Sequence, residues 1–326
     1  MNGNRAASRS LRKIKELVLD TRGLNAVPKW FHLRRALRFP IKVGIETSSL
    51  CNLKCIMCPN PHLTRRKGNL DFALYRKIVD EVTQHPVEGI ILCNYGEPLL
   101  NPAIFDMVRY AKDRGIREVR FNSNGTLLDE EAAERLIASG LDAISISMEG
   151  AREETYQRIR VNAKYQVVTE NLRRLMALKG QRRLAKPRVV LQTIRMRDNL
   201  EELDVLCRDW QPVVDEVQIT NFVNFSTMGG RVPDRRVDPV PQKRCPCLFL
   251  WERMTIFSDG RVPFCGCDAD CSVAVGDVND QSLQDIWRGE GFQAARAAHQ
   301  RGDYASLPLC ADCPDWSRRR VWFLRH

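Results

Sequence analysis

Apolar and polar positions follow two different periodicities along most of the chain. Short apolar runs rich in β-branched residues are typical of buried strands, and they occur near residues 41–47, 88–93, 117–121, 142–147, 188–194 and 214–220. Segments with apolar residues at helical spacing lie between them, among them 72–82, 104–113, 130–139 and 167–178. A strand followed by a helix, repeated six times, predicts an α/β fold with a parallel sheet and right-handed crossovers.

Polar residues gather where these predicted strands end. They lie at 46–49, 94–97, 122–125 and 145–149, and at Gln192 and Asn221. Because ligands of parallel sheets bind at the carboxyl ends of the strands, we expect the ligand-binding site to lie among these polar residues. Beyond about residue 235 the chain becomes rich in Cys, Pro and Trp. The sequence therefore predicts three parts, which are a basic extension over 1–38, a parallel-sheet domain over 39–235 and a cysteine-rich domain over 236–326.

The composition is that of a globular chain of enzyme size. With 326 residues, 44% of them hydrophobic, it argues against disorder, a collagen-like fibre and a small disulfide scaffold. No apolar run reaches the roughly 18–20 residues needed to cross a bilayer. The N-terminus also lacks the apolar core and the cleavage site of a secretory signal. We therefore expect a cytoplasmic protein.

The formal net charge of +11 comes mostly from one end of the chain. The first 38 residues hold ten Lys or Arg and two acidic residues, whereas the remainder has 41 basic and 38 acidic residues, or +3. Leu11, Ile14 and Val18 recur at helical spacing in this basic segment, which suits peripheral contact with an anionic membrane or a partner. A solvated helix packed on the body of the protein is the favoured interpretation, because basic amphipathic segments are common and rarely diagnostic.

Twelve cysteines in a cytoplasmic chain indicate metal or redox chemistry rather than disulfides. The strongest motif is Cys51-x3-Cys55-x2-Cys58, directly after the first predicted strand. Three thiolates on one loop can bind three irons of a cubane cluster and leave the fourth iron open to a substrate or cofactor. A structural zinc site is the alternative, and it would need a fourth ligand such as His62.

This spacing resembles the hallmark of the radical S-adenosylmethionine (SAM) superfamily, and the resemblance covers nearly the whole chain. It implies a partial (β/α)6 TIM-like barrel in which the open iron of a [4Fe-4S] cluster is chelated by the amino and carboxylate groups of S-adenosyl-L-methionine. Reductive cleavage would then give a 5′-deoxyadenosyl radical that abstracts a hydrogen atom from the substrate. The resemblance also implies a flavodoxin or ferredoxin as electron donor.

Five residues match SAM-binding positions of this family, namely Glu97, Asn124, Ser145, Ser147 and Arg160. Glu97 lies in a Gly-Glu-Pro segment that resembles the family's GGEP motif, which holds the methionine ammonium, although Tyr95 replaces the first glycine. Arg160 resembles the arginine that pairs with the cofactor carboxylate, a task that suits a bidentate guanidinium. Taken alone, these residues are equally consistent with turns and solvated positions, so only the resemblance assigns them to SAM.

A second set of cysteines lies in the last quarter of the chain, and it comprises Cys247, Cys265, Cys310 and Cys313. Their arrangement resembles the half-length SPASM, or twitch, domain, in which four cysteines hold one auxiliary [4Fe-4S] cluster. The chain lacks the later cysteines of a full SPASM domain, so we expect one auxiliary cluster. Two points stay open, because Cys245 could replace Cys247 as the first ligand and because these spacings also suit zinc.

Fold and clusters do not name the substrate. An auxiliary cluster can accept the electron of a substrate radical, and the family that this chain resembles includes dehydrogenases of aminocyclitols and sugars. The resemblance therefore makes oxidation of a secondary alcohol in a sugar or aminocyclitol the leading hypothesis. Cys267 and Cys271 follow Cys265, and either thiol could return a hydrogen atom as a catalytic residue, which would make the enzyme an epimerase. The short basic leader favours a small, carbohydrate-like substrate over the alternative, a peptide or protein maturase of the same family.

A zinc protein that binds nucleic acid through its basic tails is a hypothesis of another class. Trp316, Trp322 and the arginines at 318–320 form a short C-terminal patch. The body of the chain, however, does not interleave aromatic and basic residues in the way that such binding requires. We therefore expect no nucleic-acid partner.

Overall fold

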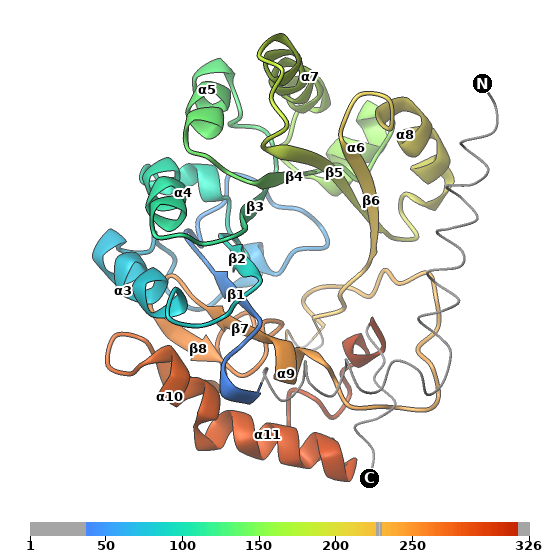
Figure 1. Ribbon diagram of the computed structural model, residues 1–326. Coiled ribbons are helices and arrows are strands. Elements are labelled where there is room, and N and C mark those ends of the chain that lie inside the picture. Colours follow the sequence, from blue (N-terminus) through green and yellow to red (C-terminus); the bar gives the residue numbers. More distant parts are fainter. Residues whose placement is uncertain (1–36, 226–227, 229, 319–326) are drawn as a thin grey trace, which may run out of the picture.

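The computed structural model describes residues 37–225, 228 and 230–318. Its main element is a seven-stranded sheet in the order β6-β5-β4-β3-β2-β1-β7, in which every neighbouring pair is parallel. The strands are β1 (Lys42–Ile45), β2 (Gly89–Ile91), β3 (Val119–Ser123), β4 (Ala143–Ser147), β5 (Arg188–Arg195), β6 (Glu216–Asn221) and β7 (Arg253–Ile256). The sheet curves with its helices on the outside (Figure 1), which confirms the predicted partial barrel.

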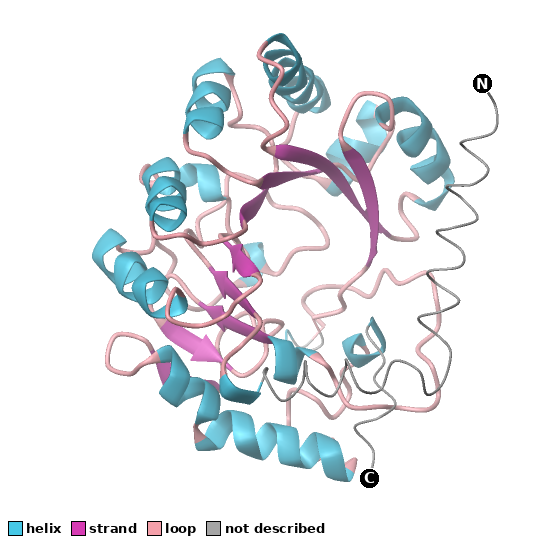
Figure 2. Ribbon diagram, viewed as in Figure 1, coloured by secondary structure: helices cyan, strands magenta, loops and turns pink. Residues whose placement is uncertain are grey.

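Helices cover the convex face of this sheet, as the secondary-structure colouring in Figure 2 makes plain. They are α3 (Phe72–Val82), α4 (Ile104–Asp113), α5 (Glu130–Ala138), α6 (Glu153–Ile159), α7 (Tyr165–Gln181) and α8 (Leu203–Trp210). The C-terminal part adds α9 (Phe249–Glu252), α10 (Leu283–Arg288), α11 (Glu290–Arg301) and an antiparallel pair, β8 (Arg261–Pro263) and β9 (Ala274–Asp277). No helix among the described residues is both long and apolar enough to span a bilayer.

Helix α3 shows how local sequence sets these elements. Its buried residues recur at three- and four-residue spacing and are Tyr75, Ile78, Val79 and Val82. The Asp71 carboxylate accepts hydrogen bonds from the backbone N–H groups of Ala73 at 2.8 Å and Leu74 at 3.0 Å. Such an N-cap contributes about 1 kcal/mol and defines where the helix begins. The bounds of α3 and α4 coincide with the predicted ranges.

Strand β7 lies outside the six strands that the sequence pattern predicted. It comes from the cysteine-rich segment, yet it pairs in parallel with β1, with Val43 opposite Met254 and Ile45 opposite Ile256. A four-residue strand gives too short an apolar run to stand out, and its place beside β1 depends on a contact between distant parts of the chain. As a result, the auxiliary cysteines are built onto the sheet edge next to the first cysteine loop.

The predicted basic amphipathic segment around Leu11, Ile14 and Val18 lies outside the described residues, and so does Trp322.

Candidate active site

Cys51, Cys55 and Cys58 lie on the loop after β1 and line a cavity of about 410 Å³. Two backbone hydrogen bonds of 3.0 Å tie this loop to residues 159–161 at the end of α6. Burial raises the pKa of all three thiols, that of Cys58 to about 12. Because a metal ligand must be a thiolate, cluster binding here must displace thiol protons.

Arg160 is buried beside this cysteine loop. Its Nη2 donates to Glu149 Oε1 at 2.9 Å, its Nε donates to the other oxygen of the same carboxylate, and its Nη1 lies 3.7 Å from Cys55 Sγ. Two guanidinium nitrogens are therefore engaged by Glu149, and the third places a positive charge against a cysteine that lines the cavity.

The Glu97 carboxylate lies at the end of β2 and lines the same cavity. It accepts hydrogen bonds from Ser123 Oγ at 2.8 Å, from the Asn124 backbone N–H at 2.7 Å and from the Leu99 backbone N–H at 3.2 Å. Burial raises the pKa of Glu97, and these hydrogen bonds oppose the shift only in part. The carboxylate thus joins the ends of β2 and β3 at the cavity wall.

Asn124 and the two serines of β4 differ in their relation to the cavity. The Asn124 side chain donates to Asn52 Oδ1 at 2.9 Å and accepts from the Thr126 backbone N–H at 2.9 Å, so it braces the cysteine loop while lining the cavity. Ser147 also lines the cavity. Ser145 lies two residues earlier on the same face of β4, farther from the carboxyl end of the strand, and is not among the lining residues.

A second, smaller cavity is surrounded by thiols from the C-terminal part, and its cysteines are Cys247, Cys265, Cys267, Cys310 and Cys313. Cys265 and Cys267 line both cavities. Cys245 is fully buried and lines neither of them. Of the two alternatives for the first auxiliary ligand, Cys247 is the one that faces the cavity.

The two spare thiols occupy different places. Cys271 is buried, lines neither cavity and donates its backbone N–H to Asp268 O at 3.1 Å. Cys267 lines both cavities, and its contact with Cys265 raises its own pKa while lowering the pKa of Cys265. The backbone N–H of Cys267 also donates to Cys265 Sγ at 3.4 Å.

Comparison with known proteins identifies the family. The family model of the Radical SAM superfamily matches residues 45–208, and the model of the SPASM iron-sulfur cluster-binding domain matches residues 245–314. The chain belongs to the radical SAM superfamily. The tungsten-containing aldehyde ferredoxin oxidoreductase cofactor-modifying protein of Pyrococcus furiosus is 25% identical over 309 residues, which cover 82% of this chain and 86% of that protein.

Two solved structures share the fold. BtrN in complex with AdoMet and 2-DOIA matches with a TM-score of 0.58 and 20% identity, covering 84% of this chain and 93% of that one. Streptococcus suis SuiB bound to the precursor peptide SuiA matches with a TM-score of 0.64 and 14% identity, covering 89% of this chain and 79% of that one. At these identities the likeness extends to the fold alone.

A radical SAM protein with a SPASM domain uses SAM, a [4Fe-4S] cluster and an auxiliary iron-sulfur cluster. The residues present fit these groups. The cysteines line two cavities, and this suits ligands that must reach separate irons of a cubane cluster.

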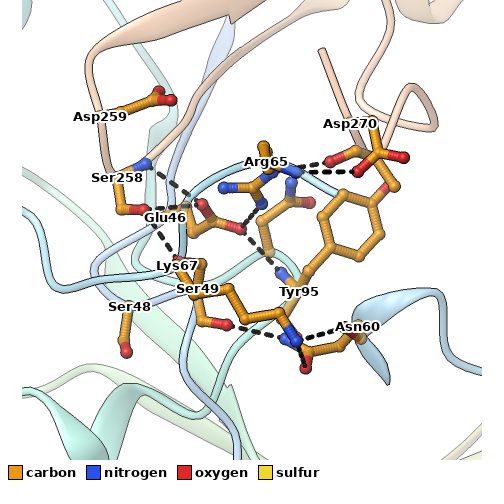
Figure 3. Close-up of polar contacts among 12 residues, drawn as sticks. Glu46, Ser48, Ser49, Asn60, Arg65, Lys67, Tyr95, Ser258, Asp259 and Asp270 are labelled. Carbon is orange, nitrogen blue, oxygen red and sulfur yellow. Dashed lines mark hydrogen bonds and ion pairs between the residues drawn. The ribbon is translucent and has the colours of Figure 1, made fainter. Parts of the chain in front are cut away.

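A buried polar network, which the sequence did not predict, joins the first cysteine loop to the SPASM domain (Figure 3). The Glu46 carboxylate accepts from Arg65 Nη2 at 2.6 Å, from the backbone N–H and Oγ of Ser258 at 3.1 Å each, and from the Tyr95 backbone N–H at 3.4 Å. Arg65 Nε donates to the Ala269 carbonyl oxygen at 2.7 Å. One carboxylate thus connects β1, β2 and the auxiliary cysteine segment.

Tyr95 is the departure from the GGEP motif, and the structure gives it a role. Its hydroxyl donates to the carbonyl oxygen of Gly266, which lies between Cys265 and Cys267. Its ring packs edge-on against Phe225 at 5.8 Å. The sequence signal for this contact was the aromatic residue in place of the expected glycine. Its partner, Gly266, became apparent only in the folded structure.

The remaining cavity wall has a polar side and an aromatic side. The polar lining residues include Asn94, Asn122, Gln192, Arg253 and Thr255, and the aromatic ones are Phe225, Phe249 and Phe264. Gln192 belongs to a predicted strand end, whereas Asn221 lines a separate pocket near Arg236. Arg253 and Thr255 come from β7, so sequence patterns that missed this strand also missed its contribution to the cavity.

Proposed function

We propose that this radical SAM enzyme is a dehydrogenase or epimerase that abstracts a hydrogen atom from a secondary-alcohol carbon of a sugar or aminocyclitol. One observation carries the proposal. A single cavity is lined by Cys51, Cys55 and Cys58 and also by Cys265 and Cys267. A substrate held there would lie next to the SAM cluster and next to the segment that carries the auxiliary ligands.

The ligand assignments follow from the lining of the two cavities. We assign the SAM cluster to Cys51, Cys55 and Cys58, and the auxiliary cluster to Cys247, Cys265, Cys310 and Cys313. Glu97 and Ser147 line the SAM cavity, and Asn124 braces its cysteine loop. Arg160 would add positive charge beside the cluster through its Nη1 group.

The proposed oxidation balances as follows. When bound, the SAM cluster and SAM supply a 5′-deoxyadenosyl radical, and the auxiliary cluster supplies a one-electron acceptor. Converting CH–OH to C=O removes two hydrogens from the substrate. One leaves as a hydrogen atom to the deoxyadenosyl carbon, and the other leaves as a proton to water while its electron goes to the acceptor.

The cavity wall supports a substrate with several hydroxyl groups. Asn122, Ser147 and Gln192 offer neutral donors and acceptors at the strand ends, which suit hydroxyls. Phe225 and Phe264 give the cavity an apolar side, which suits the C–H face of a saturated ring.

Cys267 would decide between dehydrogenation and epimerisation. Because Cys267 lines the cavity, its thiol can give a hydrogen atom back to the substrate radical when it carries its proton. The thiyl radical so formed would be restored by one electron from the external reductant and one proton. Cys271 lines neither cavity, so we assign this role to Cys267 alone.

The test is an anaerobic assay of the reconstituted enzyme with SAM, dithionite and a panel of aminocyclitols and sugars in D₂O. Dehydrogenation gives a product two mass units lighter, and epimerisation gives an epimer that carries one carbon-bound deuterium. If the enzyme is an epimerase, Cys267→Ala is expected to abolish epimer formation and Cys271→Ala to leave it unchanged. Equal epimer yields from both variants would contradict the thiol assignment.

A peptide or protein maturase is the second candidate. SuiB, whose structure holds a precursor peptide, matches this chain with a TM-score of 0.64 over 89% of its length. The same assay with short peptides separates the candidates, because a maturase would form 5′-deoxyadenosine and a modified peptide. That result, with no conversion of any sugar or aminocyclitol, would overturn the proposed function.

A further inference from the structure

A histidine lies at the auxiliary cavity together with its cysteines. His299, on α11, is 1% exposed and is one of the cavity-lining residues. Its two ring nitrogens have different partners. Nδ1 lies 3.1 Å from the backbone nitrogen of Cys247, and Nε2 lies 3.3 Å from Cys310 Sγ. The imidazole therefore bridges two cysteines of the proposed ligand set, Cys247 and Cys310.

The partner of Nδ1 determines where the imidazole proton sits. A backbone N–H can only donate, so Nδ1 must accept and carries no proton. An imidazolium carries a proton on both nitrogens, so a ring whose Nδ1 accepts this hydrogen bond is neutral. A neutral imidazole has one N–H, which must then be on Nε2. This N–H points at the Cys310 sulfur, and a protonated Nε2 has no lone pair with which to bind iron.

Packing holds the ring in this orientation. Trp251 and Tyr304 contact the imidazole in edge-on arrangements, with ring centroids 6.5 Å and 5.0 Å away. Arg244 stacks on Tyr304 at 4.1 Å and donates from Nη1 to Ala311 O at 2.8 Å, which places a positive charge on the same side of the cavity. The ring therefore cannot turn away from Cys310 without disturbing several contacts.

We propose that His299 is a positioning residue that donates an Nε2–H hydrogen bond to Cys310 and so raises the reduction potential of the auxiliary cluster. Reduction adds negative charge to a cluster and its sulfurs, and a hydrogen bond to a ligand sulfur stabilises the more negative state. A higher potential favours transfer of the substrate's electron to this cluster. The inference rests on the proposed role of Cys310 as a ligand, and it holds for either substrate class.

The experiment compares His299→Leu, which removes the donor, with His299→Gln, whose amide N–H can take the place of Nε2–H. Each full-length reconstituted protein is titrated with reductant and followed by EPR, without substrate. The auxiliary cluster is the signal that added SAM leaves unchanged. We expect His299→Leu to lower the equilibrium constant for its reduction about tenfold, or about 59 mV for one electron, and His299→Gln to keep the wild-type value. His85→Leu, at a ring stacked on Phe39, is the matched control and should not shift the potential.

An unchanged potential in His299→Leu, or the same shift in His299→Gln, would overturn the proposal. Should His299→Leu fail to hold the auxiliary cluster, His299→Asn replaces it, because this side chain can accept from Cys247 but is too short to donate to Cys310. A lower potential for the Asn variant than for the Gln variant supports the proposal, and equal potentials overturn it. No substrate enters the titration, so its outcome is independent of the sugar and peptide assays.

Discussion

Because Glu46 and Arg65 form a buried ion pair, we expect the effect of Glu46→Gln on the free energy of unfolding to depend on whether Arg65 is present. The two charged groups are 2.6 Å apart, and their side chains are 0% and 1% exposed. Arg65→Met removes the cation while keeping most of its apolar stem, and it leaves the Glu46 carboxylate buried without a counter-charge. Removing one partner of a buried pair costs about 3–5 kcal/mol of unfolding free energy.

Glu46→Gln alone is expected to cost a similar amount, about 3–5 kcal/mol, because it leaves the Arg65 guanidinium buried without its anion. In the Arg65→Met background, by contrast, Glu46→Gln is expected to raise the free energy of unfolding. The neutral amide buries no charge, and its oxygen can still accept from Ser258. The double variant then loses about 1–3 kcal/mol for donors left imperfectly paired. It should therefore be about 2 kcal/mol more stable than Arg65→Met.

The assay is anaerobic urea unfolding of the four reconstituted proteins, with the midpoint and slope followed by tryptophan fluorescence. Arg109→Met is the matched control, because Arg109 pairs with Asp106 at 3.2 Å with both side chains 54% exposed, and its loss should cost less than about 1 kcal/mol. Destabilisation by Glu46→Gln in both backgrounds would refute the reasoning, since it would mean that hydrogen bonding, not charge, dominates at this site.

Two further predictions follow from close approach and from cavity lining. Gly96→Ala should abolish SAM binding in equilibrium dialysis, because a Cβ there would lie 2.0 Å from the Ser48 carbonyl oxygen. The control Gly68→Ala should bind SAM normally, because its Cβ would meet nothing within 4 Å. Normal binding by both variants would show that the loop can shift. With four irons per cubane cluster, Cys247→Ala should reduce the iron content from about eight to about four per chain, whereas Cys245→Ala should keep about eight. The reverse result would make Cys245, and not Cys247, the auxiliary ligand.

Most of the features that could be predicted depend on residues that lie close together in the sequence. The six strands and the bounds of α3 and α4 follow from apolar periodicity, which a local segment expresses by itself. Cys51, Cys55 and Cys58 line one cavity because they lie within eight residues of each other on the same loop. The radical SAM resemblance, with its cofactors, depends on this spacing and was confirmed by the family comparison.

The pairings between distant segments were decided only by the fold. Cys267 and Cys271 are equivalent as a pattern, yet only Cys267 lines the cavities, because the turn after it carries Cys271 away into the protein. The same holds for the bond from Tyr95 to Gly266, which joins positions 171 residues apart.

The sequence by itself determined the cluster chemistry and the alternation of strand and helix. The tertiary structure decided that β7 completes the sheet beside β1, that Glu46 and Arg65 pair across the loop, and that His299 meets Cys310. The physical reason is the range of the interactions. Periodicity and ligand spacing act over a few residues, whereas a buried hydrogen bond or ion pair depends on which distant groups the folded chain removes from water together.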